Sequence, residues 1–174
     1  MTSNPKSADR DDLVVGIDPG LSGAVALLGY DRGSKFVTVF SMPCREKKSG
    51  RREVDAEALV LLFDDHLHRR KPVSFIIERV SAMPGQGVSG MFSLGDSFGV
   101  VRALAEAYRA HRVHYISPTV WKGSLGLLKK KKSDSLSLAR RLYPPARPSL
   151  YRKKDEGRAE ALLIAHYARA TLKW

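Results

Sequence analysis

The chain has 174 residues, a formal net charge of +12 and a single cysteine, Cys44. This length is typical of one domain with its own hydrophobic core. One cysteine excludes an intramolecular disulfide framework and a cysteine-based zinc site. No apolar stretch is long enough to cross a bilayer, and the excess of lysine and arginine favours a polyanionic partner, with nucleic acid ahead of a membrane surface.

The first part of the chain predicts a polar tail followed by an antiparallel meander. Residues 1–12 are polar and lack the apolar run of a signal peptide, so we expect a frayed tail there. Three short apolar runs then follow one another across short turns, at residues 13–17, 24–28 and 36–42. Runs with such short connections are expected to pair as antiparallel strands.

The rest of the chain alternates between helices and strands. Apolar spacing and capping residues predict helices at 55–68, 92–110, 133–142 and 156–172, and a short helical segment after Ser117. Buried strands are predicted at 73–77 and 113–116, and loops at 81–90 and around the prolines at 144–148. This order predicts a single domain over residues 13–174, with one mixed α/β sheet and helices on its faces.

Positive charge gathers in three segments. Five basic residues lie in a loop-like stretch between Arg45 and Arg52, residues 129–132 are consecutive lysines, and a third group surrounds Asp155 and Glu156. A solvated basic face is the plain interpretation of such runs, and contact with nucleic-acid phosphates is the functional one.

Two carboxylates occupy equivalent positions at strand ends. Asp18 and Glu78 each stand where an apolar run stops and a glycine-rich loop begins. If the two strands are neighbours in the sheet, both side chains reach one point at its edge. Each residue also has a structural interpretation, Asp18 as a turn-former before Pro19 and Glu78 as a solvated strand end.

A third acidic group precedes and enters the predicted last helix. Glu156 and Glu160 are four residues apart and therefore share a helix face. Acidic residues favour a helix N-terminus, which by itself explains Asp155 and Glu156. That preference explains Glu160 less well, because the apolar residues after it predict a buried helix.

Carboxylates without a matching cysteine or histidine cluster suit a hard cation, Mg²⁺ with Mn²⁺ as a substitute. Two such ions can clamp the attacking water and the leaving oxygen of a phosphodiester. The basic segments would bind a polyanion while the carboxylates hold the metal at the scissile phosphate. The combination predicts a nuclease.

Four segments in order resemble the RuvC family of Holliday-junction resolvases: residues 14–23 (VVGIDPGLSG), 75–80 (FIIERV), 93–100 (SLGDSFGV) and 160–165 (EALLIA). Two further segments, 83–87 (MPGQG) and 153–161 (KKDEGRAEA), are similar to the phage and chloroplast branch of that family. The resemblance implies an RNase H-like fold. Its five-stranded mixed sheet has three antiparallel strands followed by two parallel ones and is flanked by helices.

The same resemblance implies that Asp18, Glu78 and Glu160 are catalytic metal ligands. The bacterial pattern has a further acid or histidine three residues before the last acid, where this chain has Gly157. Asp155 and Glu156 are the available substitutes, and the motif of the phage and chloroplast branch favours Asp155.

The resemblance also implies substrate contacts. Lys122 and Lys132 match family lysines that contact DNA, and Trp121 is interpreted as a packing residue. Bacterial relatives place an aromatic residue three positions after the second acid, where this chain has Ser81, so another side chain has to wedge into the junction core. The full set of DNA-binding candidates is Lys122, Lys129, Lys130, Lys131, Lys132, Arg152, Lys153 and Lys154, with Met83, Met91 and Phe92 as wedge residues.

Together these features predict a homodimeric, Mg²⁺-dependent crossover-junction endonuclease that makes paired symmetric nicks in four-way DNA junctions. The resemblance places the dimer contact on helix 92–110, where an apolar stripe from Phe98 to Tyr108 is expected to supply it. The alternatives are another RNase H-like nuclease acting on RNA or other branched DNA, a non-catalytic junction-binding module, and a sugar-kinase-like ATPase. The expected location is the cytoplasm of a bacterial or phage-infected cell rather than a plastid.

Overall fold

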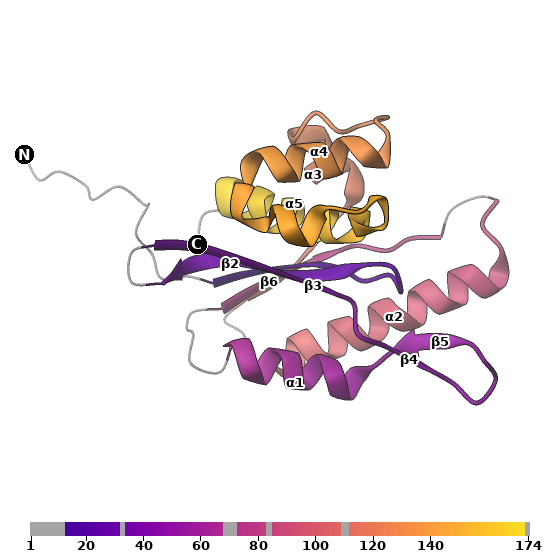
Figure 1. Cartoon of the computed structure of the whole chain (residues 1–174). Coiled ribbons are helices and arrows are strands. Elements are labelled where there is room, and N and C mark those ends of the chain that lie inside the picture. Colours follow the sequence, from indigo (N-terminus) through magenta and orange to yellow (C-terminus); the bar gives the residue numbers. More distant parts are fainter. Residues whose placement is uncertain (1–12, 32–33, 68–72, 83–84, 109–111, 173–174) are drawn as a thin grey trace, which may run out of the picture.

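A computed structural model describes residues 13–31, 34–67, 73–82, 85–108 and 112–172. The predicted tail at 1–12 and the wedge candidate Met83 lie outside these residues. The centre of the molecule is a five-stranded sheet with the order β3-β2-β1-β6-β7 (Figure 1). Its strands are β1 (Leu13–Asp18), β2 (Ala24–Asp31), β3 (Ser34–Ser41), β6 (Val73–Glu78) and β7 (Arg112–Ile116).

Strand directions in the sheet match those implied by the sequence. β1 pairs antiparallel with β2, and β2 pairs antiparallel with β3. β1 pairs in parallel with β6, and β6 pairs in parallel with β7. The first three strands therefore form the predicted meander, and the last two extend the sheet across helical connections, which parallel strands require.

Helices cover both faces of the sheet (Figure 1). On one face lie α1 (Ala56–Leu67) and α2 (Val88–Ala107). The opposite face carries the remaining helices: α3 (Pro118–Ser124), α4 (Lys132–Leu142), the 3₁₀ helices η1 (Pro144–Leu150) and η2 (Lys153–Asp155), and α5 (Glu156–Thr171).

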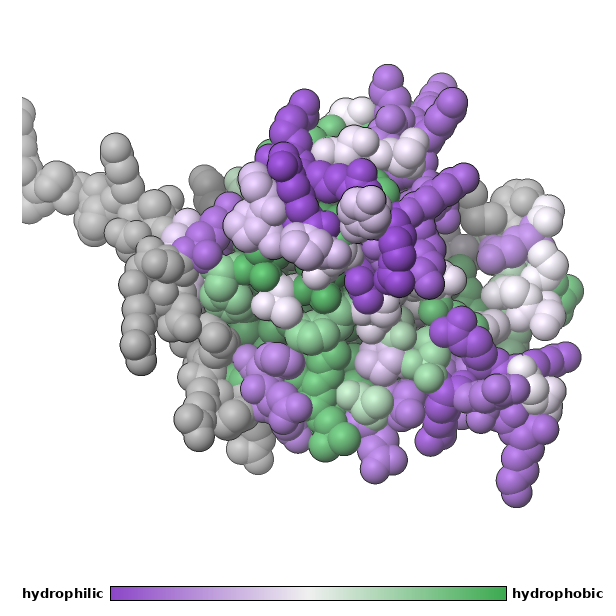
Figure 2. All heavy atoms as spheres, in the orientation of Figure 1, coloured by the Kyte–Doolittle hydropathy of each residue, from purple (hydrophilic) through white to green (hydrophobic). Residues whose placement is uncertain are grey.

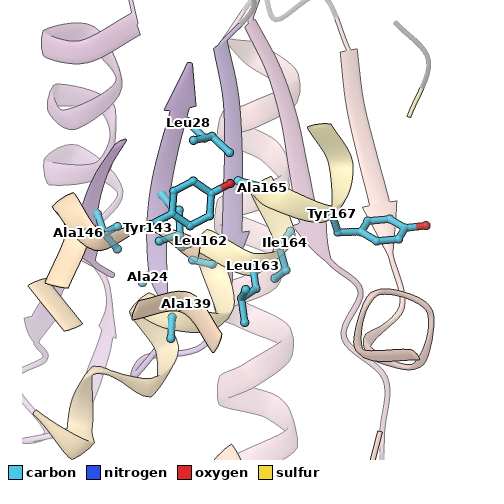
Figure 3. Packing of buried hydrophobic residues seen from close by; sticks show 14 of the residues in the cluster. Ala24, Leu28, Ala139, Tyr143, Ala146, Leu162, Leu163, Ile164, Ala165 and Tyr167 are labelled. Carbon is cyan, nitrogen blue, oxygen red and sulfur yellow. The ribbon is translucent and has the colours of Figure 1, made fainter. Parts of the chain in front are cut away.

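Alternation along the strands divides the core into two clusters. Val15 and Ile17 of β1 pack towards α1 and α2, whereas Val14 packs towards α5. Side chains two residues apart share a face of a strand, so one apolar run supplies both clusters. Figure 3 shows the second cluster, in which side chains of α5, α4 and η1 meet Ala24 and Leu28 of β2.

Gly16 allows α5 to lie directly on β1. A Cβ atom at this position would be 2.3 Å from the carbonyl oxygen of Ala161 and 2.6 Å from the backbone nitrogen of Ala165. No side chain fits there without moving the helix backbone. This close approach brings the first turns of α5 to the edge of the sheet where β1 ends.

The structure differs from the sequence-based expectation at several connections. The basic stretch after β3 is a hairpin of two short strands, β4 (Cys44–Glu46) and β5 (Arg52–Val54), rather than a loop. α2 begins at Val88, within the predicted loop, and α4 begins one residue before Ser133. The proline-rich segment is the 3₁₀ helix η1, because proline suits the first turn of a helix.

The apolar stripe proposed for a dimer contact on α2 is largely used inside the molecule. Val101 and Ala105 are fully buried, and Phe98, Leu104 and Tyr108 pack against the same core cluster. Phe98, Leu104 and Tyr108 are only partly buried, Val88 and Phe92 are exposed on another face of α2, and the dimer contact stays a prediction. Within the described residues, no helix has the length and apolar character needed to span a membrane.

Candidate active site

Asp18 and Glu78 lie side by side at one edge of the sheet. They are the last residues of β1 and β6, and the preceding pair, Ile17 and Ile77, is in parallel register. The pKa of Asp18 is raised to about 7, first by burial and then by the negative charges of Glu78 and Glu160. A carboxylate with such a pKa carries an electrostatic cost that a nearby cation would remove.

Glu160 reaches the same edge from α5 and is only 8% exposed. Its Oε1 atom lies 2.9 Å from Nζ of Lys122 in α3. The Lys122 charge also lowers the pKa of both Asp18 and Glu78, so one ammonium group partly offsets three carboxylates. The sequence placed Lys122 against substrate, whereas here it forms an ion pair with a candidate metal ligand.

Trp121 holds Glu78 through a hydrogen bond that the sequence analysis missed. The indole Nε1–H donates to Oε2 of Glu78 at 2.6 Å, and the Trp121 side chain is completely buried. Burial raises the pKa of Glu78, and the bond from Trp121 acts against that rise. Trp121 is therefore a packing residue, as predicted, and also a donor to the site. The available signal was that a buried indole N–H needs a partner.

Gly157 explains why this chain lacks the acid of the bacterial pattern. A Cβ atom at Gly157 would lie 2.2 Å from the carbonyl oxygen of Ser22, in the turn that follows Asp18. The first turn of α5 thus packs against that turn through bare backbone. No aspartate or histidine fits at this position unless α5 moves away.

The two candidate substitutes for that acid have different surroundings. Asp155 is 3% exposed and accepts hydrogen bonds from the backbone N–H of Arg152 at 2.7 Å and from its guanidinium at 2.9 Å. Burial opposes ionisation of Asp155, but the bonds from Arg152 outweigh it and lower the pKa. Glu156 is the first residue of α5 and is half-buried. The Asp155 carboxylate therefore caps the N-terminus of η2. Its role as a metal ligand stays a prediction.

The basic candidates differ in their exposure and in their distance from the carboxylates. The consecutive lysines 129–132 are exposed, and the charge of Lys132 lowers the pKa of Glu78. Lys153 and Lys154 are also exposed, whereas Arg152 is bound to Asp155. Figure 2 shows hydrophilic side chains gathered over the α3–α5 layer and again where Figure 1 draws the β4–β5 hairpin.

Of the wedge candidates, Phe92 is the more accessible, at 76% exposed. Met91 is half-buried and lines a pocket of about 200 Å³ beside the start of α2, together with Val80, Leu94 and Phe98. The contact of either residue with DNA stays a prediction.

The donor chemistry of the site suits a hard divalent cation. Asp18, Glu78 and Glu160 offer carboxylate oxygens, and the raised pKa of Asp18 reflects its burial first and the nearby charges of Glu78 and Glu160 second. As the side chains stand, the described residues contain no group of three or more acidic, histidine or cysteine side chains close enough to hold one ion.

Comparison with known proteins supports the resemblance found in the sequence. No protein-family model matches the chain. The chloroplastic Holliday junction resolvase MOC1 of Chlamydomonas reinhardtii is 36% identical over 97 residues, which cover 53% of this chain and 10% of that relative. The chain thus spans only about a tenth of the relative's length.

Three solved structures resemble almost the whole chain. Thermus thermophilus RuvC has a TM-score of 0.53 at 15% identity, covering 90% of this chain and 94% of that one. The T. thermophilus RuvC complex with Holliday junction substrate has 0.50 at 19%, covering 89% and 90%. The yeast mitochondrial Holliday junction resolvase Ydc2 has 0.53 at 16%, covering 92% and 79%. The chain has the RNase H-like fold of RuvC-type resolvases.

Proposed function

We propose that this protein is a Holliday-junction resolvase, a crossover-junction endodeoxyribonuclease that depends on Mg²⁺ or Mn²⁺. The observation that carries the proposal is the convergence of Asp18, Glu78 and Glu160 at one edge of an RNase H-like sheet, beside exposed lysines. A module that only binds DNA has no use for three carboxylates that repel phosphates. Their presence favours catalysis over simple binding.

The chain's own residues prepare the site in three ways. Asp18, Glu78 and Glu160 would hold a pair of divalent cations, which when bound would activate water and stabilise the leaving 3′-oxyanion. Trp121 orients one carboxylate through its indole N–H. Lys122 compensates charge at Glu160 and is long enough to turn towards a phosphate when the carboxylates are otherwise neutralised. Asp155 is the proposed fourth ligand, with Glu156 as the alternative.

A homodimer suits the near two-fold symmetry of a four-way junction. An interface with C2 symmetry places two equivalent sites on opposed strands, so that the products are paired nicks with 5′-phosphates. We propose that the exposed side of α2 near Val88 and Phe92 contributes to this interface. The proposed location is a bacterial or phage-infected cytoplasm, and the chloroplastic relative makes a plastid the alternative.

The test is cleavage of a labelled synthetic four-way junction in Mg²⁺ and in EDTA, with linear duplex of the same sequence and an RNA duplex alongside. We expect symmetric nicks that need both the metal and the junction. Asp18→Asn should bind the junction with wild-type affinity and not cut it. Tight binding by the wild type without any nick would favour a binding module, and preferential cleavage of the RNA duplex would favour another RNase H-like nuclease.

A further inference from the structure

The β4–β5 hairpin is a braced projection that carries unbalanced positive charge. β4, β5 and the turn between them contain five basic residues and only two acidic ones. The backbone N–H of Lys47 donates to Arg51 at 2.7 Å, and Gly50 takes a left-handed conformation with φ of 75° that closes the turn. In Figure 1 the hairpin extends beside the first half of α2.

Only part of this charge is neutralised within the chain. Arg45 and Lys47 pair with Glu53 at 2.9 and 2.6 Å, across the hairpin. In the part of the chain that the structure describes, no carboxylate lies within ion-pair distance of the remaining three basic residues, which are all exposed: Lys48, Arg51 and Arg52. Like charges within one short hairpin repel one another, and an external polyanion relieves that repulsion.

The base of the hairpin is joined to the turn that follows Asp18. The backbone N–H of Met42 donates to the carbonyl oxygen of Gly23 at 3.0 Å. The Cys44 thiol lies 3.5 Å from the carbonyl oxygen of Leu21. Met42 and Val54 are buried in the core cluster that also contains Ile17. The hairpin therefore starts at the same edge of the sheet as the three carboxylates, and its position is set by that edge.

We propose that the β4–β5 hairpin binds the sugar–phosphate backbone of a duplex arm that leaves the cleavage site, through Lys48, Arg51 and Arg52. This inference rests on the proposed function and adds to it a contact surface outside the catalytic edge. The backbone pairing of β4 with β5 holds the hairpin in shape before DNA arrives, so little backbone freedom is lost on binding. The contact would not depend on base sequence, because phosphates carry none.

The test compares two variants that each lose two arginines in the full-length chain. Arg51→Gln/Arg52→Gln removes charge from the hairpin, and Arg112→Gln/Arg141→Gln removes the same charge elsewhere. Arg112 begins β7, at the end of the sheet opposite Glu78, and Arg141 is near the far end of α4 from Lys132. Binding of a labelled four-way junction is measured in EDTA over a range of salt concentrations. Cleavage in Mg²⁺ is measured at saturating protein.

We expect the hairpin variant to bind the junction about 10-fold or more weakly near 0.1 M salt. Its plot of log Kd against log salt should be shallower by about 2, since each lost phosphate contact removes roughly 0.9. Its cleavage rate at saturation should equal that of the wild type. The control variant should lose only the small affinity that follows from its lower net charge. Its slope of log Kd against log salt should stay close to that of the wild type.

Two outcomes are distinguishable. If the wild type binds and nicks the junction but the hairpin variant has the affinity and slope of the control variant, the hairpin inference is overturned and the proposed function stands. If the wild type neither binds nor nicks a junction, the proposed function itself fails. Should the variant not fold, acetylation of Lys48 in the wild type decides: protection by bound junction supports the contact, and unchanged reactivity overturns it.

Discussion

Replacing Trp121 with phenylalanine would remove the donor that holds Glu78 while keeping an aromatic ring in the core. The lost bond is short, 2.6 Å, and has a carboxylate as its acceptor. Hydrogen bonds to charged groups contribute about 1.5–3 kcal/mol, and losing a partner that orients a metal-binding side chain typically lowers metal affinity about 10–100-fold. We therefore expect Trp121→Phe to weaken Mg²⁺ binding by about 10–100-fold.

The pH dependence of stability separates the effect of the lost hydrogen bond from the effect of lost packing. Burial raises the pKa of Glu78, and the bond from Trp121 limits that rise. An acid whose pKa is raised in the folded state costs stability as the pH rises from its unfolded pKa through its folded pKa. Without the donor this cost grows, so Trp121→Phe should destabilise the protein more at pH 8 than at pH 4. The loss of packing destabilises the variant equally at the two pH values. It amounts to a fraction of the about 3–5 kcal/mol that is typical of removing a buried aromatic side chain.

The assay combines calorimetric titration with Mg²⁺ and urea unfolding at both pH values. Tyr143→Phe is the matched control, because Tyr143 is 3% exposed and its hydroxyl bonds to Nδ1 of His166 at 2.8 Å, away from the carboxylates. The control should lose stability and keep its Mg²⁺ affinity. Wild-type Mg²⁺ affinity in Trp121→Phe, with equal destabilisation at the two pH values, would refute the positioning role of the indole.

Three further predictions follow from the carboxylates and the helix that packs on them. Because the pKa of Asp18 is raised to about 7, Asp18→Asn should be more stable than the wild type at pH 8, by at most about 4 kcal/mol, and equally stable at pH 4, as read from urea unfolding. For the same reason, Mg²⁺ binding at pH 6.5 should release a proton and strengthen towards pH 8. Titration calorimetry in buffers of different ionisation enthalpy measures that release, and a binding enthalpy independent of the buffer would contradict it. Gly157→Ala should lose about 1–3 kcal/mol or more through its clash with Ser22, whereas Gly99→Ala, with open space around its Cβ, should not; equal unfolding midpoints would contradict this account.

Much of the fold was predictable because short-range patterns carry it. Apolar runs broken by turn residues predicted all five strands of the main sheet. Their short turns predicted the antiparallel pairings, and the family resemblance implied the parallel ones. The hairpin after β3 was missed because its strands have three residues each and are rich in charge, which resembles a loop. The stripe on α2 proved to pack partly on the core, because helical spacing identifies an apolar face but not the surface that covers it.

For the candidate site, too, the sequence identified some features and the tertiary structure decided others. The sequence alone identified the candidate carboxylates, because Asp18 and Glu78 end apolar strands and Glu160 begins an apolar stretch of helix. Only the tertiary structure decided how they are held: the Trp121 bond to Glu78, the Lys122 pair with Glu160, and the arginine contacts of Asp155. These contacts join residues up to 43 positions apart. Local propensity encodes strands and helices, whereas the partner of a buried polar group is chosen only when the layers close on one another.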